Sequence, residues 1–201
     1  MTHDVETAVG RDFCATLMDI TSSFGFLSSY QVVPEVRYTV PESYRREVVE
    51  RGCDLNLHGI NHDGRLFRDR ETFSTRRDRM KYYVQEWKVR GFRSPVLYRN
   101  ADWMHELPFD YDMTYPNVAH LDSQRGGCCT VMPYTFENLI ELPLTTTQDY
   151  TLFNIFSDYT IDLWNKQIDA IIEYNGLISF NIHPDYVIGS QPRDVYRRLL
   201  D

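Results

Sequence analysis

The chain has 201 residues, 42% of them hydrophobic and 14% aromatic, which is typical of a globular protein with one domain and a sizeable core. Its net charge of −8 argues against a nucleic acid as the main partner and favours a small or neutral ligand. The sequence has no apolar run of about 18 residues, so it predicts no membrane span. The first ten residues lack the features of a signal peptide, and we therefore expect a cytoplasmic protein.

Hydrophobic periodicity, glycines and prolines divide the chain into alternating elements. In chain order, we expect a helix over residues 8–24, a strand over 26–33, a helix over 41–52, a strand over 53–58, a helix over 71–91, a short extended segment over 92–95, one or two helical turns over 101–107, strands over 109–115 and 139–144, a helix over 157–176, a strand over 177–184 and a helix over 191–201.

Strands that alternate with helices indicate an α/β fold with a parallel sheet covered by helices. Both an open doubly wound sheet and a distorted (β/α) barrel fit this pattern. The sequence contains no Gly-rich phosphate-binding motif, so nucleotide-binding versions of the open sheet lose support.

Ionisable residues gather where the expected strands end. They lie in "THDVE" at the start of the chain, in "HGINH" after the strand over 53–58, in "FRSP", in "FDYD" and in "NIHP". Since the loops that follow parallel strands meet at one face of the fold, we expect these segments to converge on one site. Each motif alone has a simpler explanation as a surface or core feature, and the convergence of all five carries more weight.

Such a set of side chains has a definite chemistry. Two neutral imidazoles and one carboxylate form a three-ligand set for zinc or another divalent metal, with a coordination position left for water. The metal lowers the pKa of the water and polarises a carbonyl group, a second carboxylate takes the water proton, and another histidine protonates the leaving group. The motifs therefore predict the metal-assisted hydrolysis of an amide or an ester.

With these motifs in this order, the sequence resembles the polysaccharide deacetylases, the NodB-homology domains of carbohydrate esterase family four. The resemblance covers nearly the whole chain through "THDVE", "HGINH", "FRSP", "YDMTYP" and "FNIHP". It implies one domain over residues 1–201 with a NodB-like fold, an incomplete TIM-type barrel. It also implies a divalent metal, with zinc preferred, and a carbohydrate substrate that loses acetyl groups.

The resemblance also implies roles for individual residues. Asp4 corresponds to the catalytic base, Arg93 to the arginine that orients this base, and His183 to the general acid. The backbone N–H of Val96 corresponds to a donor that stabilises the oxyanion. Two metal ligands correspond to His58 and His62.

Two positions depart from the family pattern. The third metal ligand would fall on Val5, which cannot bind metal, and Glu6 is the natural substitute. The acidic partner of His183 is either Asp112 or Asp149, and Asp112 is taken as the first candidate.

A strand is expected before "THDVE", yet only Met1 precedes this motif, so we also expect a domain shortened at both ends. Two alternatives to a deacetylase remain at this point. One is a hydrolase of the same fold that acts on a cyclic ureide or imide. The other is a glycan-binding module whose catalytic site has decayed.

Overall fold

The computed structural model describes residues 1–119 and 121–201. Within this part of the chain, the strands form one sheet in the order β1-β2-β3-β4-β5-β7-β6. Only β6 runs antiparallel to its neighbour β7, and all other adjacent strands are parallel. The strands are β1 (Thr2–Val5), β2 (Ser29–Val32), β3 (Asp54–Leu57), β4 (Gly91–Phe92), β5 (Tyr111–Asp112), β6 (Tyr134–Phe136) and β7 (Leu139–Glu141).

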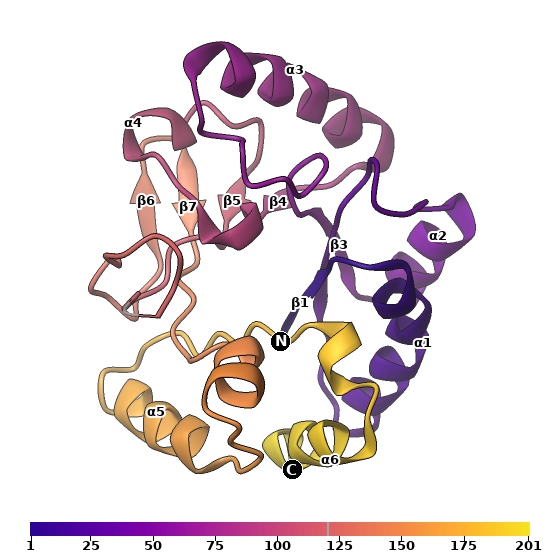
Figure 1. Cartoon of the computed structure of the whole chain (residues 1–201), viewed down its shortest axis with the longest axis vertical. Coiled ribbons are helices and arrows are strands. Elements are labelled where there is room, and N and C mark those ends of the chain that lie inside the picture. The colour runs from indigo at the N-terminus through magenta and orange to yellow at the C-terminus, as the bar shows by residue number, and fades with distance from the viewer. Residues whose placement is uncertain (120) are drawn as a thin grey trace.

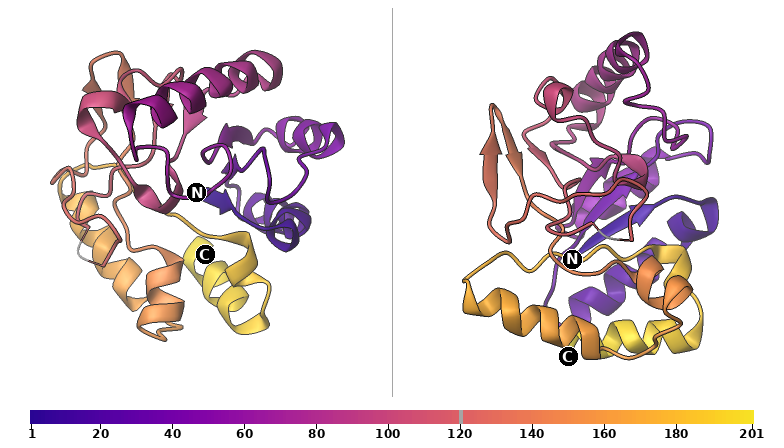
Figure 2. Two further views of the ribbon diagram at one scale, coloured as in Figure 1. Left: turned by 45° about the horizontal axis from the view of Figure 1, so that its top comes forward. Right: turned by 60° about the vertical axis from the view of Figure 1, so that its left-hand side comes forward.

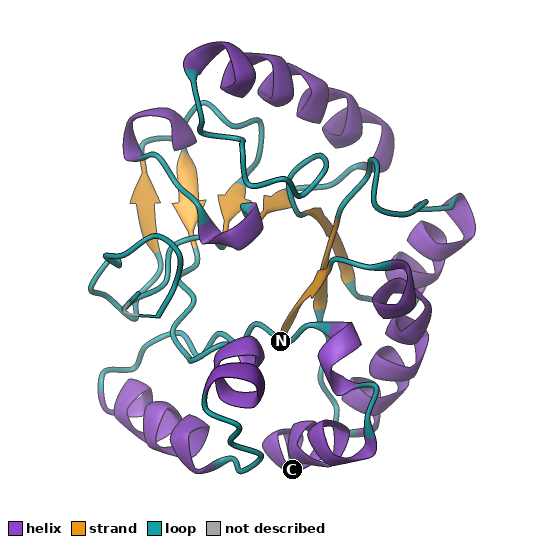
Figure 3. Ribbon diagram, in the orientation of Figure 1, coloured by secondary structure: helices purple, strands orange, loops and turns teal. Residues whose placement is uncertain are grey.

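The helices lie outside the curved sheet, with the strands near the middle of the molecule (Figures 1 and 3). The views in Figure 2 show the same arrangement from two other directions. The α-helices are α1 (Ala8–Ser23), α2 (Glu42–Glu50), α3 (Arg70–Trp87), α4 (Ala101–Met104), α5 (Asp162–Glu173) and α6 (Ser190–Leu200). Short single turns η1 (Pro95–Leu97), η2 (Thr151–Ile155) and η3 (Pro184–Val187) lie in the loops between them.

The sheet does not close into a full barrel, since β1 and β6 are its edge strands. Two irregular segments, one after β7 and one that contains residues 179–182, lie in the open part of the barrel, the gap beside β1. On one side of the gap, the backbone N–H of Thr2 donates to Phe180 and the N–H of Ile182 donates to Thr2 (3.1 and 3.0 Å). On the other side, the N–H of Thr146 donates to Ser179 over 3.2 Å. The architecture is therefore the expected α/β fold with a distorted (β/α) barrel.

The expected strand over 177–184 is reduced to a single bridge between Thr2 and Asn181. The expectation that a strand is missing before "THDVE" is wrong, because Thr2–Val5 is itself the first strand and pairs with β2 along its full length. The sequence did not indicate β6 or the η2 turn.

Side-chain caps fix where the helices begin. The hydroxyl of Thr7 accepts from the N–H of Gly10 at the start of α1, and the carboxylate of Asp69 accepts from the N–H of Thr72 at the start of α3 (3.0 and 2.7 Å). Thr7 lies in the loop after β1, and Asp69 lies in the loop after β3. Both helices therefore begin in loops that follow strand ends. Within the described residues, none of the helices combines the length and apolar character needed to cross a membrane.

Candidate active site

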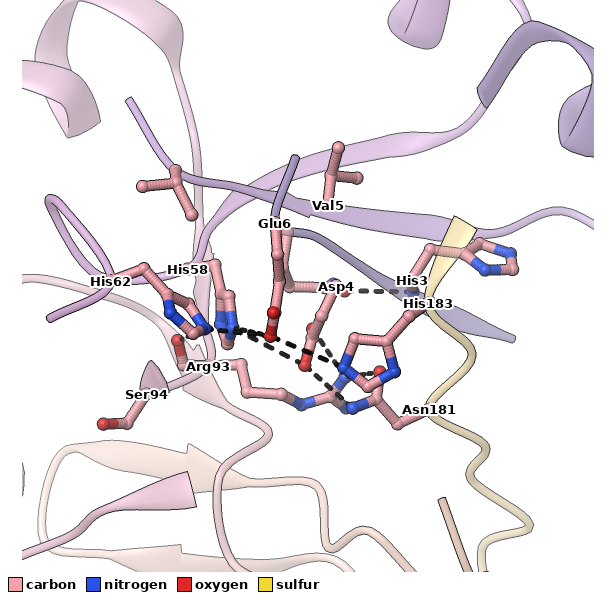
Figure 4. A network of polar contacts seen from close by, with 12 residues as sticks. His3, Asp4, Val5, Glu6, His58, His62, Arg93, Ser94, Asn181 and His183 are labelled. Atoms are coloured by element: carbon pink, nitrogen blue, oxygen red, sulfur yellow. Dashed lines mark hydrogen bonds and ion pairs between the residues drawn. The ribbon is translucent and has the colours of Figure 1, made fainter. Parts of the chain in front are cut away.

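Strand alternation decides which side chains of "THDVE" face the interior of the barrel. In β1, successive side chains point to opposite faces, so Asp4 points one way while His3 and Val5 point the other. Val5 is fully buried in the main hydrophobic core, and His3 stacks on Tyr30. Glu6, the residue after the strand, returns to the side of Asp4 (Figure 4). The alternation therefore explains why Glu6, and not Val5, joins the polar cluster.

Glu6, His58 and His62 form the metal-binding candidate within the described part of the chain. One ligand atom from each lies within 4.8 Å of the others. The Glu6 Oε1 atom lies 2.8 Å from His62 Nε2 and 3.5 Å from His58 Nε2. A carboxylate and two imidazoles at these separations can move onto one ion with small side-chain rotations.

The ring of His58 is oriented as a metal ligand requires. Its Nδ1 atom lies 3.0 Å from the carbonyl oxygen of Arg93, which fixes the proton on that nitrogen. Its Nε2 atom is buried and has no hydrogen-bond partner among the described residues, so its lone pair is directed at the cluster. An orphaned buried nitrogen of this kind fits a divalent metal, since without a partner its burial is costly.

The loop that carries both histidines turns at Gly59, which has a φ of +70°. A Cβ atom at this position would come within 2.6 Å of the Pro95 ring, so only glycine allows this loop to pack against the "FRSP" loop. The glycine therefore brings His58 and His62 together with the loop of Arg93.

The carboxylate of Asp4 is held by two buried side chains. The guanidinium of Arg93 donates to Oδ1 over 3.0 Å, and the amide of Asn181 donates to Oδ2 over 2.8 Å. Burial alone raises the pKa of Asp4, but the nearby charges, above all that of the Arg93 guanidinium, outweigh it and hold the pKa below its ordinary value. Asp4 is therefore an ionised carboxylate whose Oδ2 atom lies 3.8 Å from His58 Nε2.

His183 lies on the other side of Glu6 from His58 and His62 (Figure 4). The Nδ1 atom of His183 lies 2.7 Å from Asp149 Oδ1, and its backbone N–H donates to Asp149 Oδ2 over 2.6 Å. Burial lowers the pKa of His183, but Asp149 and Glu6 outweigh this effect and raise the pKa well above its ordinary value. The acidic partner of His183 is therefore Asp149.

Asp112 does not contact His183 and instead lies behind the "FRSP" loop, which corrects the first candidate for this role. Its Oδ1 atom accepts from the Thr114 hydroxyl over 2.6 Å, and that hydroxyl accepts from the N–H of Ser94 over 2.9 Å. Glu141 lies opposite Asp112 on the neighbouring strand β7, and burial raises the pKa of both groups. Asp112 therefore supports the loop from inside the core.

Val96 follows this supported segment and has a φ of +58°, which is unusual for a β-branched residue. Its N–H has no acceptor within the described residues, and the residue lines the same cavity as Asp4, Glu6 and His183. The cavity has a volume of about 200 Å³. Strained backbone of this kind is retained where the surroundings fix it, often at functional sites.

No protein-family model matches the sequence, and no curated protein matches it. Solved structures do match. A protein assigned as a polysaccharide deacetylase from Mycobacterium smegmatis matches with a TM-score of 0.75 and 18% identity, over 100% of this chain and 81% of that chain. The chain has the NodB-like polysaccharide deacetylase fold.

Two further structures share this deacetylase fold. A family 4 carbohydrate esterase from Streptomyces lividans, in complex with acetate, matches with a TM-score of 0.53 and 13% identity, over 98% of this chain and 85% of that chain. The PuuE allantoinase matches with a TM-score of 0.65 and 14% identity, over 94% of this chain and 65% of that chain.

On this fold, one cavity is lined by most of the residues predicted from the sequence, namely Asp4, Glu6, His58, His62, Val96 and His183. Arg93 lies directly behind Asp4. Asp110, the first aspartate of "FDYD", lies outside this cavity and pairs with Arg90 at the surface.

Sequence reasoning missed Asn181, although a signal was available. It stands two residues before His183, so in an extended segment both side chains point to the same face.

Proposed function

We propose that this protein is a metal-dependent deacetylase that hydrolyses the C–N amide bond of an N-acetylated sugar. The observation that carries this proposal is the adjacency of two units in one cavity. One unit is the cluster of Glu6, His58 and His62, and the other is the fixed carboxylate of Asp4. The structures described above place the chain in a fold used by deacetylases and esterases, which supports a carbohydrate substrate.

In this proposal, Glu6, His58 and His62 hold the divalent metal, and zinc suits a set of two imidazoles and one carboxylate. A bound metal supplies a water of lowered pKa and polarises the acetyl carbonyl group. Arg93 contributes through its backbone, since its carbonyl oxygen orients the His58 ring.

Asp4 takes the proton of the attacking water. Support for this role comes from its low pKa and its two fixed hydrogen bonds, which keep the carboxylate ionised and aimed at the cluster. The N–H of Val96, which has no acceptor among the described residues and belongs to a residue of the cavity wall, donates to the developing oxyanion.

His183 gives a proton to the departing amine. Its Nδ1 atom is occupied by Asp149, so the proton to be transferred is on Nε2, 3.5 Å from Glu6 Oε1 and therefore at the cavity. The raised pKa keeps this histidine charged at neutral pH, as a general acid requires.

A metal analysis combined with acetate release from N-acetylglucosamine oligomers tests this proposal. We expect one zinc per chain and turnover that chelation abolishes and zinc restores. His62→Ala should lose both zinc and turnover, whereas Asp4→Asn should keep zinc and lose turnover. His105→Ala is the matched control, because His105 pairs with Glu137 away from the cavity. Protein without bound zinc, with both histidines intact, would refute the proposal.

A hydrolase of a cyclic ureide or imide is the second candidate, and the fold shared with the PuuE allantoinase favours it. A panel with allantoin and hydantoin next to the sugar oligomers separates the two. Turnover of a cyclic amide alone, with the same loss in Asp4→Asn, would assign this second function. A glycan-binding module with a decayed catalytic site would bind the sugar oligomers equally well with and without the Asp4→Asn change. It would turn over neither the sugar oligomers nor the cyclic amides.

A further inference from the structure

A second cavity of about 440 Å³ adjoins the candidate active site. Leu121, Asp122, Gln148 and Thr151 line both this cavity and the one that contains Asp4 and His183. The two cavities therefore lie side by side along these four residues, so a part of a ligand that leaves the active site on this side would meet the second cavity. Its volume alone lies in the range of ordinary ligand pockets.

The polar side chains in the wall of the second cavity largely bond to one another. The side-chain amide of Gln167 accepts from the N–H of Thr147 and donates to its hydroxyl, both over 2.9 Å. Gln148 donates to Asp122 over 2.9 Å and also accepts from Asn181 over 3.1 Å. Since a sugar ring needs free donors and acceptors for its hydroxyl groups, this wall is poorly suited to a second sugar unit.

Apolar side chains form much of the remaining wall, beside Asn117, Thr146 and Thr151. Val118 and Leu121 are each 53% exposed and Phe156 is 50% exposed, although all three are large and apolar. Leu144 is buried at the same cavity. Exposed apolar side chains that gather around one hollow, next to an active site, are characteristic of a surface that an apolar ligand covers.

We propose that this second cavity binds an apolar hydrocarbon chain of the substrate, so that the protein acts on an amphiphilic N-acylated glycoside. This inference rests on the proposed function of the adjoining site and adds the class of substrate to it. The chain has two possible positions in such a molecule: the alkyl group of the aglycone, or an acyl group longer than acetyl on the nitrogen.

Kinetics with matched substrates distinguish these two positions. One arm compares the octyl and methyl β-glycosides of N-acetylglucosamine, and the other compares N-octanoyl and N-acetyl groups on the methyl glycoside. We expect one octyl or octanoyl substrate to exceed its short counterpart in kcat/KM by roughly tenfold or more, the gain expected from burying about two methylene groups. Phe156→Ser should abolish the gain. Phe26→Ser is the matched control, because Phe26 is 45% exposed and precedes β2 at the opposite end of the strands.

Direct binding separates this inference from the proposed function. Octyl β-glucoside has no amide to hydrolyse, and its binding to the metal-free protein can be measured by calorimetry at concentrations where it is monomeric. We expect it to bind at least tenfold more tightly than methyl β-glucoside, with this difference lost in Phe156→Ser and kept in His58→Ala. If this difference in binding is found but no acetate is released from any substrate, the apolar site is supported and the proposed deacetylase function is refuted. Equal binding of octyl and methyl glucosides, or turnover in which neither arm gains, would overturn the inference.

Discussion

The buried pair of Asp112 and Glu141 makes the stability of the protein depend on pH in a way that one substitution should remove. Both side chains are almost fully buried, at 0% and 1% exposure. Asp112 Oδ2 has no hydrogen-bond partner among the described residues, and Glu141 lies opposite Asp112 on the neighbouring strand. We therefore expect a proton held between the two carboxyl groups to supply the missing bond. Burial and the charge of Asp112 raise the pKa of Glu141 well above its ordinary value.

The sign follows from proton linkage. The folded protein retains a proton on Glu141 that the unfolded chain releases above about pH 4.3. The stability due to this proton is therefore fully present below about pH 4.3 and is lost as the pH rises toward the folded pKa. One proton corresponds to a loss of about 1.4 kcal/mol in the free energy of unfolding per pH unit across this window.

Glu141→Gln should remove this loss, because an uncharged amide has the shape of the protonated acid. The amide oxygen can still accept from the N–H of Tyr115, as Oε1 does over 3.0 Å, and the amide nitrogen can donate to Asp112. Urea unfolding of the metal-free protein at pH 5, 6 and 7 gives the test. We expect the variant to gain about 1.4 kcal/mol over the wild type per pH unit in the window above.

Glu173→Gln, a change of the same kind at an exposed position on α5, should follow the wild type at every pH. Parallel curves for wild type and Glu141→Gln, or a variant that is less stable at pH 7, would refute the shared proton.

Three further predictions concern the cavity itself. Asp149→Asn should lower acetate release by about 10²- to 10⁴-fold, because His183 loses the anion that raises its pKa, and unchanged zinc content would exclude a loss of metal as the cause. Arg93→Met should lower the free energy of unfolding by about 3–5 kcal/mol in urea, since Asp4 is left buried without its cation, and a variant of unchanged stability would contradict the ion pair. Zinc at about 100 times its Kd should stabilise the wild type by about 2.7 kcal/mol in thermal unfolding, and His58→Ala should lose most of this gain.

The alternation of strands and helices could be predicted because it depends on local patterns of hydrophobic residues and glycines. The segment over 177–184 looked like a strand because its residues are apolar and β-branched. In the folded chain, however, it lies in the gap of the barrel, where its neighbours are irregular and only Asn181 forms a bridge. Propensity describes the segment alone, whereas pairing depends on its neighbours.

The site could be predicted as far as its residues end the strands expected from the sequence, as His58 and His183 do, although only the first of these strands forms. The sequence could not decide whether Asp112 or Asp149 is the acidic partner of His183, because the answer depends on where each side chain points in the folded chain. Asp112 is the last residue of β5 and faces Glu141 on the neighbouring β7, a pairing that follows from the register of those strands. Asp149 reaches His183 from an irregular segment whose path no periodicity describes.

The contacts of Arg93 tie two parts of the site to one residue. Its side chain holds Asp4 and also Asn181, two residues before His183, and its carbonyl oxygen holds His58. A change in the path of the "FRSP" loop would therefore act on Asp4, on His58 and on the segment that carries His183 at the same time.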